Sequence, residues 1–105
     1  MNTIHAELSI IPIGTGSTSL GRYIAIVIDA IRKEGIDCNI TPMGTLIESN
    51  DIDVIFNAIN KAREALFNEG IKRVEIILRI DERLDKPRSM EDKVISVEKY
   101  LRELE

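Results

Sequence analysis

Alternating hydrophobic and polar residues predict four β-strands in this chain. Ile4 to Pro12 and Arg73 to Asp81 both alternate with the period of a half-buried strand. Between them, Asn39 to Glu48 is typical of a hairpin, because a Pro-Met-Gly sequence interrupts two short strand patterns. The hairpin therefore supplies the second and third strands.

The turn chemistry of the hairpin predicts which of its side chains share a face. Pro42 favours the first turn position, and Gly44 is suited to a left-handed residue that closes a three-residue loop. Thr41 and Thr45 would then pair across the loop. This register places Asn39, Thr41, Thr45 and Ile47 on one face, and Cys38, Ile40, Leu46 and Glu48 on the other.

Three other stretches have the period of amphipathic helices. The first covers residues 20–34 and stops at Gly35, and we expect a hydroxyl side chain among residues 17–19 to cap it. The second follows polar cap residues at 49–51 and ends at Gly70. The third follows a capping box at residues 89–92 and carries a narrow apolar stripe of Val94, Val97 and Leu101.

The resulting order, β-α-β-β-α-β-α, predicts an α+β fold. It is the split β-α-β arrangement of ferredoxin-like domains plus a C-terminal helix, and we expect residues 1–105 to form one domain. Right-handed crossovers place the first and third strands side by side, and we expect them to run parallel, with antiparallel edge strands. This arrangement would bring the loop at residues 14–19 close to Glu48, and residues 79–83 close to the hairpin turn and His5.

One face of the sheet should be covered by the first two helices, which leaves the other face open. Three isoleucines lie on this predicted open face among polar and charged residues, a mixture too apolar for permanent contact with water. We therefore expect a partner to cover it. Its predicted members are His5, Glu7, Ser9, Ile11, Asn39, Thr41, Thr45, Ile47, Glu75, Ile77 and Arg79.

Charge and composition narrow the choice of partner and compartment. The net charge is −4, and Lys and Arg form no basic stripe, which argues against nucleic acid and anionic membranes as partners. Cys38 is the only cysteine and alternates with Ile36 and Ile40, so we expect a core residue and no disulfide framework. No segment approaches the roughly 18 apolar residues of a membrane span. These features favour a cytoplasmic protein.

Candidate chemistry is sparse. His5 is the only histidine, so no His-Cys or His-His metal set can form, and no acid–base pair stands out for catalysis. The loop at residues 14–19 leads into a helix N-terminus that could attract an anion, although it lacks the Gly-Lys-Ser/Thr of a P-loop. It is either a capping loop or a ligand contact. Residues 79–83 form either a solvated ion-pair network or a binding site, and Glu48 is either a surface residue or a carboxylate for a cationic ligand.

Three motifs are spread along the chain: Pro12-Ile13-Gly14-Thr15-Gly16 with Ser19 close behind, the run from Thr41 to Glu48, and Arg79-Ile80-Asp81-Glu82-Arg83. Together they resemble the thiamine-binding protein family, short single-domain relatives of YkoF-like proteins, and Pro-Met-Gly-Thr-x-x-Glu is the most specific part. The resemblance implies a ferredoxin-like fold and homo-oligomers, a dimer or a dimer of dimers, built through the open sheet face. It also implies binding of thiamine or its hydroxymethylpyrimidine moiety without catalysis, and we expect no cofactor or metal.

Ten residues are expected to bind the ligand if the resemblance holds: Thr15, Ser17, Ser19, Thr41, Met43, Gly44, Thr45, Glu48, Arg79 and Asp81. Two alternatives stay open. The first is an assembly or regulatory module whose open sheet face binds another chain without a small molecule. The second is a small dimeric enzyme of ferredoxin-like fold, which the lack of an acid–base pair disfavours.

Overall fold

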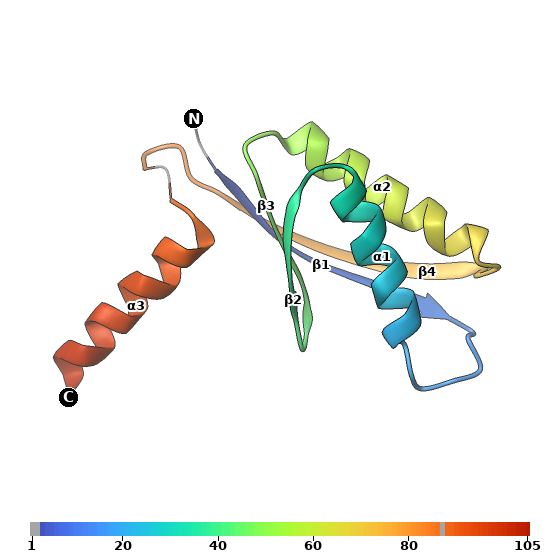
Figure 1. Cartoon of the computed structure of the whole chain (residues 1–105). Coiled ribbons are helices and arrows are strands. Elements are labelled where there is room, and N and C mark those ends of the chain that lie inside the picture. Colours follow the sequence, from blue (N-terminus) through green and yellow to red (C-terminus); the bar gives the residue numbers. More distant parts are fainter. Residues whose placement is uncertain (1–2, 87) are drawn as a thin grey trace.

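The computed structural model describes residues 3–86 and 88–105. Seven elements follow one another in the predicted order, so the α+β fold class is confirmed. In Figure 1, α1 and α2 lie on the same face of the sheet, and α3 extends from one end of it. The elements are β1 (Ile4–Ile13), α1 (Gly21–Lys33), β2 (Asp37–Thr41), β3 (Gly44–Ser49), α2 (Ile52–Asn68), β4 (Arg73–Glu82) and α3 (Met90–Leu104).

The four strands form one sheet in the order β2-β3-β1-β4, and each neighbouring pair is antiparallel. The adjacency of β1 and β3 was predicted correctly, but their parallel orientation was wrong. The crossover through α1 makes β1 parallel to β2, and the hairpin then reverses the chain, so β3 runs against β1. As a result Leu8 faces Thr45, and His5 faces Glu48.

The hairpin loop has two residues and not the predicted three. Thr41 pairs with Gly44, so only Pro42 and Met43 form the turn, and Gly44 is the first residue of β3 without a positive φ. The Thr41 side chain stabilises this turn: Oγ1 accepts hydrogen bonds from the Met43 and Gly44 N–H groups at 3.3 and 3.0 Å. The Thr41 hydroxyl thus closes the turn, and the left-handed glycine on which the prediction depended is not needed.

This shift of one residue places the β3 side chains on the opposite face from the predicted one. Thr45 and Ile47 point toward the helices and are 5% and 0% exposed, so their predicted place on the open face was wrong. Leu46 and Glu48 take those places, opposite Asn39 and Asp37 of β2. The open face, meaning the sheet face away from α1 and α2, therefore carries Ile11, Ile13, Leu46 and Ile77 as its large apolar residues.

The hydrophobic core lies between the other sheet face and the two helices. Leu8, Ile31, Ile47, Ile55 and Leu66 are fully buried, and each such side chain contributes about 1.5–3 kcal/mol through its removal from water. Cys38 belongs to the same core, as predicted. Within the described residues, no helix is both long and apolar enough to span a bilayer.

The ends of the helices agree with the sequence in most places. Gly35 and Gly70 adopt positive φ directly after α1 and α2, as the predicted stops require. The Asp51 side chain accepts a hydrogen bond from the Asp53 N–H, and Ser89 and Asp92 form the predicted capping box. The expected hydroxyl cap on α1 was wrong, because that helix begins after Leu20 without a side-chain cap.

Candidate functional site

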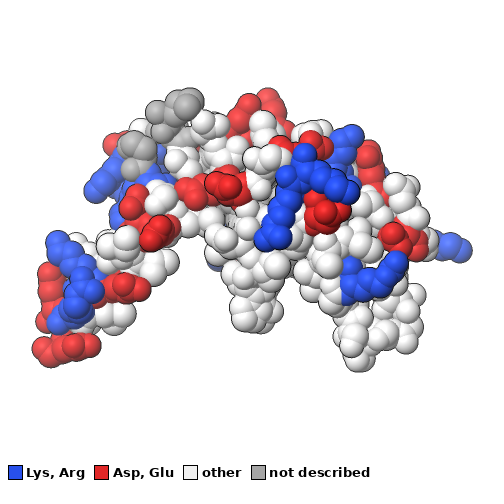
Figure 2. All heavy atoms as spheres, in the orientation of Figure 1, with Lys and Arg blue, Asp and Glu red and all other residues white. Residues whose placement is uncertain are grey.

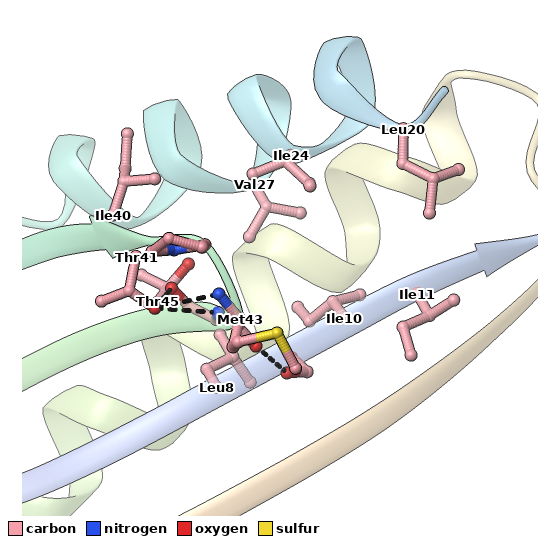
Figure 3. A pocket seen from close by; sticks show the side chains of 13 residues that line it. Leu8, Ile10, Ile11, Leu20, Ile24, Val27, Ile40, Thr41, Met43 and Thr45 are labelled. Atoms are coloured by element: carbon pink, nitrogen blue, oxygen red, sulfur yellow. Dashed lines mark hydrogen bonds between the residues drawn. The ribbon is translucent and has the colours of Figure 1, made fainter. Parts of the chain in front are cut away.

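A pocket of about 260 Å³ opens between α1 and the β2–β3 hairpin. Figure 3 shows side chains of β1 on one side of it, side chains of α1 on another and the hairpin turn on the third. The β1 side is formed by Leu8, Ile10 and Ile11, and the α1 side by Leu20, Ile24 and Val27. The pocket thus lies at the edge of the core, next to the end of the short strand β2.

The lining of this pocket contains no charged side chain and no aromatic ring. Its polar side chains are Ser9, Thr41 and Thr45. The Thr41 hydroxyl is engaged in the turn and donates to the Gly44 carbonyl at 2.8 Å, while Ser9 Oγ donates to the Met43 carbonyl at 3.5 Å. Among the described residues the Thr45 hydroxyl has no hydrogen-bond partner, so it is the group best able to bind a ligand.

Four of the ten predicted ligand-binding residues line this pocket: Thr41, Met43, Gly44 and Thr45. Met43 lies at the rim and is 85% exposed. Figure 2 shows two uncharged projections, the hairpin tip and the loop that leads into α1, on either side of a hollow. The uncharged character therefore extends from the pocket to its surroundings.

The three predicted hydroxyl residues of the glycine-rich loop do not line the pocket. Thr15 Oγ1 donates to the Ser17 carbonyl at 2.9 Å and accepts from the Ser17 N–H at 3.3 Å. Ser17 Oγ accepts from the Ser19 N–H at 3.0 Å. These bonds order the loop itself, and the loop in turn leads to Leu20, which does line the pocket.

The three remaining predicted residues, Glu48, Arg79 and Asp81, lie on the open face toward the other end of β1. His5 faces Glu48 on one side and Asp81 on the other, and its Nε2 atom lies 3.6 Å from Glu48 Oε1. Arg79 pairs with Glu7 at 3.5 Å, and Asp81 pairs with Lys93 of α3. The hydrogen bond from Lys93 holds the pKa of the Asp81 carboxyl below its usual value.

The antiparallel sheet explains which predicted proximities were wrong. Glu48 does not lie near the glycine-rich loop, and Asp81 does not lie near the hairpin turn, because both lie beside His5. The predicted neighbourhood of Asp81 and His5 is confirmed, because it depends only on the pairing of β1 with β4. Within the described residues, no group of three or more His, Cys, Asp or Glu side chains could hold a metal ion.

Several pocket residues were not predicted as part of a site. Leu20, Ile24 and Val27 recur at helical spacing and were assigned to the core stripe of the first helix. Ile24 and Ile40 nevertheless stay exposed at the pocket. The sequence did contain a signal for these residues: the apolar stripe of α1 is longer than the short strand β2 that packs beside it. This signal could be interpreted only with the correct register of the hairpin.

The family model described as thiamine-binding protein matches residues 6–98, a range that includes the whole pocket. This chain belongs to the thiamine-binding protein family. Among proteins similar to it is a UPF0045 protein of Methanothermobacter thermautotrophicus, 44% identical over 93% of this chain and 99% of that protein. YqgV, a UPF0045 protein of Bacillus subtilis, is 41% identical over 91% of this chain and 95% of its own length.

Solved structures share the fold of this chain. MJ1052 of Methanocaldococcus jannaschii superposes with a TM-score of 0.83 at 35% identity, over 92% of this chain and 97% of that chain. A Thermotoga maritima protein whose name refers to thiamine biosynthesis or salvage superposes with a TM-score of 0.73 at 19% identity, over 90% of this chain and 98% of that chain. The second likeness concerns the fold alone.

Proposed function

We propose that this protein binds thiamine or its hydroxymethylpyrimidine moiety in the cytoplasm without catalysing a reaction, and that the pyrimidine ring enters the pocket between α1 and the hairpin. The observation that carries this proposal is the lining of the pocket. Apolar side chains surround a single available hydroxyl, that of Thr45, in a member of the thiamine-binding protein family. A dry slot with few polar groups is the usual environment for a small heterocycle.

The size and charge of the pocket favour the pyrimidine half of the ligand. Pockets for drug-sized ligands have roughly 300–1,000 Å³, so 260 Å³ suits one ring better than two. Thiamine also carries a cationic thiazolium, and burying a charge without a partner is costly. Because no carboxylate lines the pocket, the thiazolium would stay at the mouth, beside the exposed Met43 side chain.

Titration calorimetry with hydroxymethylpyrimidine, thiamine and the isolated thiazole alcohol tests this proposal. The first two ligands should bind and the third should not. Thr45→Val should weaken binding about tenfold, because loss of one hydrogen bond to the ring costs on the order of 1.4 kcal/mol. Thr18→Val is the matched control, since Thr18 is exposed in the loop before α1 and does not line the pocket. Absence of heat at millimolar ligand would refute the proposal.

Self-association through the open face is the second part of the proposal. Ile77 is 56% exposed there, Ile11 and Leu46 lie on the same face, and paired charges such as Glu7 and Arg79 surround them. A two-fold copy would cover these apolar side chains and let the charges pair across the interface. Ile77→Asp should therefore dissociate the assembly, as light scattering after size-exclusion chromatography would measure. A parent protein that is monomeric at micromolar concentration contradicts this part.

The exposed open face also favours a second candidate function, an assembly or regulatory module that binds no small molecule. The two candidates differ in one measurement. An assembly module would form oligomers but would show neither heat nor a shift in melting temperature with hydroxymethylpyrimidine.

A further inference from the structure

The C-terminal helix α3 is the least integrated element of the described chain. It extends away from the sheet (Figure 1), and none of its residues is buried. Only its first turn lies over the open face, where Met90, Lys93 and Val94 of the helix and Leu46 and Arg79 of the sheet line a shared pocket of about 350 Å³. Among residues 3–86 and 88–105, the rest of the helix has no partner that would account for its apolar side chains.

These apolar side chains follow the spacing of a coiled-coil seam. The intervals between successive positions are four, three, four and three residues, which is the heptad repeat that lets one helix pack along another. Val97 in the middle of the seam is 59% exposed. The seam residues are Met90, Val94, Val97, Leu101 and Leu104.

We propose that α3 pairs in parallel with α3 of a second copy through this seam. This proposal rests on the self-association through the open face that is proposed above. A seam of two heptads is too short to hold two chains together by itself, so we infer that it acts as a second contact in the same assembly. The same helix face that begins over the open sheet face continues into the seam. One partner copy would therefore cover both surfaces.

The charges beside the seam favour a second α3 in parallel orientation. Lys93 directly precedes one seam residue and Glu98 directly follows the next, and in a parallel pair these two positions face each other across the interface. An antiparallel pair would instead place Glu91 and Glu98 opposite glutamates. Between Met90 and Leu104 the helix has four acidic and three basic residues, so its charge does not favour an anionic membrane as the partner.

Two substitutions that differ only in the helix face test the seam. Val97→Glu and Ile95→Glu each replace an exposed β-branched residue, 59% and 51% exposed, by the same charge, but only Val97 lies in the seam. Sedimentation velocity over a concentration series should show a dissociation constant at least tenfold higher for Val97→Glu and unchanged for Ile95→Glu. At concentrations too low for assembly, both proteins should melt like the parent, because neither residue is buried within one copy.

A cysteine placed at the end of the seam tests the orientation. The native Cys38 is buried, so an added cysteine would be the only accessible thiol among the described residues. With an added oxidant, Leu104→Cys should give a disulfide-linked dimer, because equivalent seam positions are adjacent in a parallel pair. Lys99→Cys, on the outer face of the helix, should not. Failure of Leu104→Cys to cross-link would overturn the parallel arrangement.

The possible failures can be distinguished from one another. A monomeric parent would overturn the seam together with self-association through the open face. Equal assembly of Val97→Glu and Ile95→Glu, with dissociation of Ile77→Asp, would overturn the seam alone. Dissociation of Val97→Glu with an intact Ile77→Asp assembly would support the seam, would overturn the contact through the open face, and would overturn the premise that the seam needs that second contact.

Discussion

The two ends of β1 differ sharply in chemistry although they belong to one ten-residue strand. Toward Ile13, at the hairpin end, β1 borders a pocket whose lining has no charge. Toward Ile4, at the charged end, its neighbours include His5 between two carboxylates, Arg79 paired with Glu7, and Lys93 paired with Asp81. The strand contributes to this contrast through His5 and Glu7 at one end and Ile10 and Ile11 at the other, and the residues that the sheet places beside it add to the contrast.

This difference indicates separate roles for the two ends. Exposed ion pairs such as Arg79 with Glu7 contribute little to stability, typically about 0.2–1 kcal/mol, and they keep a surface hydrated. A neutral heterocycle gains little from such a surface and much from a dry pocket. We therefore place ligand binding at the hairpin end, and we expect the charged end to anchor α3 and to border the interface between copies.

The largest effect on stability is expected from a larger side chain at Gly44, at the hairpin end of β1. A Cβ atom at Gly44 would lie 3.2 Å from the Leu8 carbonyl oxygen and 3.4 Å from the side chains of Glu7 and Ser9. Gly44→Val should therefore lower the free energy of unfolding by about 1–3 kcal/mol through overpacking, and it should weaken ligand binding as well. Urea denaturation and calorimetry measure the two effects.

Gly21→Ala provides the control for this substitution. Gly21 begins α1, has no positive φ, and a Cβ there would meet no atom within 4 Å. Its replacement should leave stability unchanged or slightly higher, because alanine favours the helix. A Gly44→Val protein as stable as the parent would show that β3 can move away from β1 and that the hairpin end is not rigid.

A smaller effect is expected from acid, and only at the charged end and the start of α3. The pKa of Asp81 is lowered by Lys93, and that of Asp92 by the Ser89 N–H that it binds in the capping box. Carboxyls with lowered folded-state pKa values stabilise the fold fully above their unfolded pKa of about 3.9, and this contribution is lost as the pH falls through the folded values. Both contacts of α3 should therefore weaken below about pH 4.

Far-UV circular dichroism between about pH 5 and pH 2.5 measures this effect. The helical signal of the parent should fall in acid before the core unfolds. The double variant Asp81→Asn with Asp92→Asn should show a weaker pH dependence, because its amides do not titrate while the amide oxygen introduced at position 92 can still accept the bond from the Ser89 N–H. Identical pH profiles for the parent and the double variant would exclude these two carboxyls as the cause.

The fold was predictable from the sequence because each element carries its own signal. The strands have period two, the helices have apolar stripes, and Gly35, Gly70 and the Ser89 capping box mark helix ends that the structure confirms. Strand register was not predictable in the same way, because it depends on one turn. The direction of β3 was predictable, because a crossover that makes β1 parallel to β2 and a hairpin that reverses the chain require β3 to run against β1. The Thr41 hydroxyl can bind two N–H groups and close a two-residue loop without a left-handed glycine, and the sequence alone did not decide between the two loops.

The error in the hairpin loop also affected the predicted site. Thr41, Met43, Gly44 and Thr45 line the candidate pocket together because they lie together in the sequence and stay together in the hairpin. Glu48 belongs to the same sequence run, yet the two-residue loop and the antiparallel pairing carry it to the open face beside His5. The hydroxyls of the glycine-rich loop were expected to bind ligand through the family resemblance, and in the structure those of Thr15 and Ser17 bond within the loop.

The smallest effect is expected from Glu48, and it separates the two ends most directly. Thr45 and Glu48 are three residues apart on β3, about 10 Å along the strand, and their side chains point to opposite faces. A ligand held by Thr45 is therefore out of reach of Glu48, and Glu48→Gln should change the affinity for hydroxymethylpyrimidine less than twofold. Glu75→Gln is the matched control, because it removes the same charge from the open face beside Ile11. If calorimetry instead gives a tenfold loss for Glu48→Gln and none for Thr45→Val, the ligand binds at the charged end, and the pocket at the hairpin is not the site.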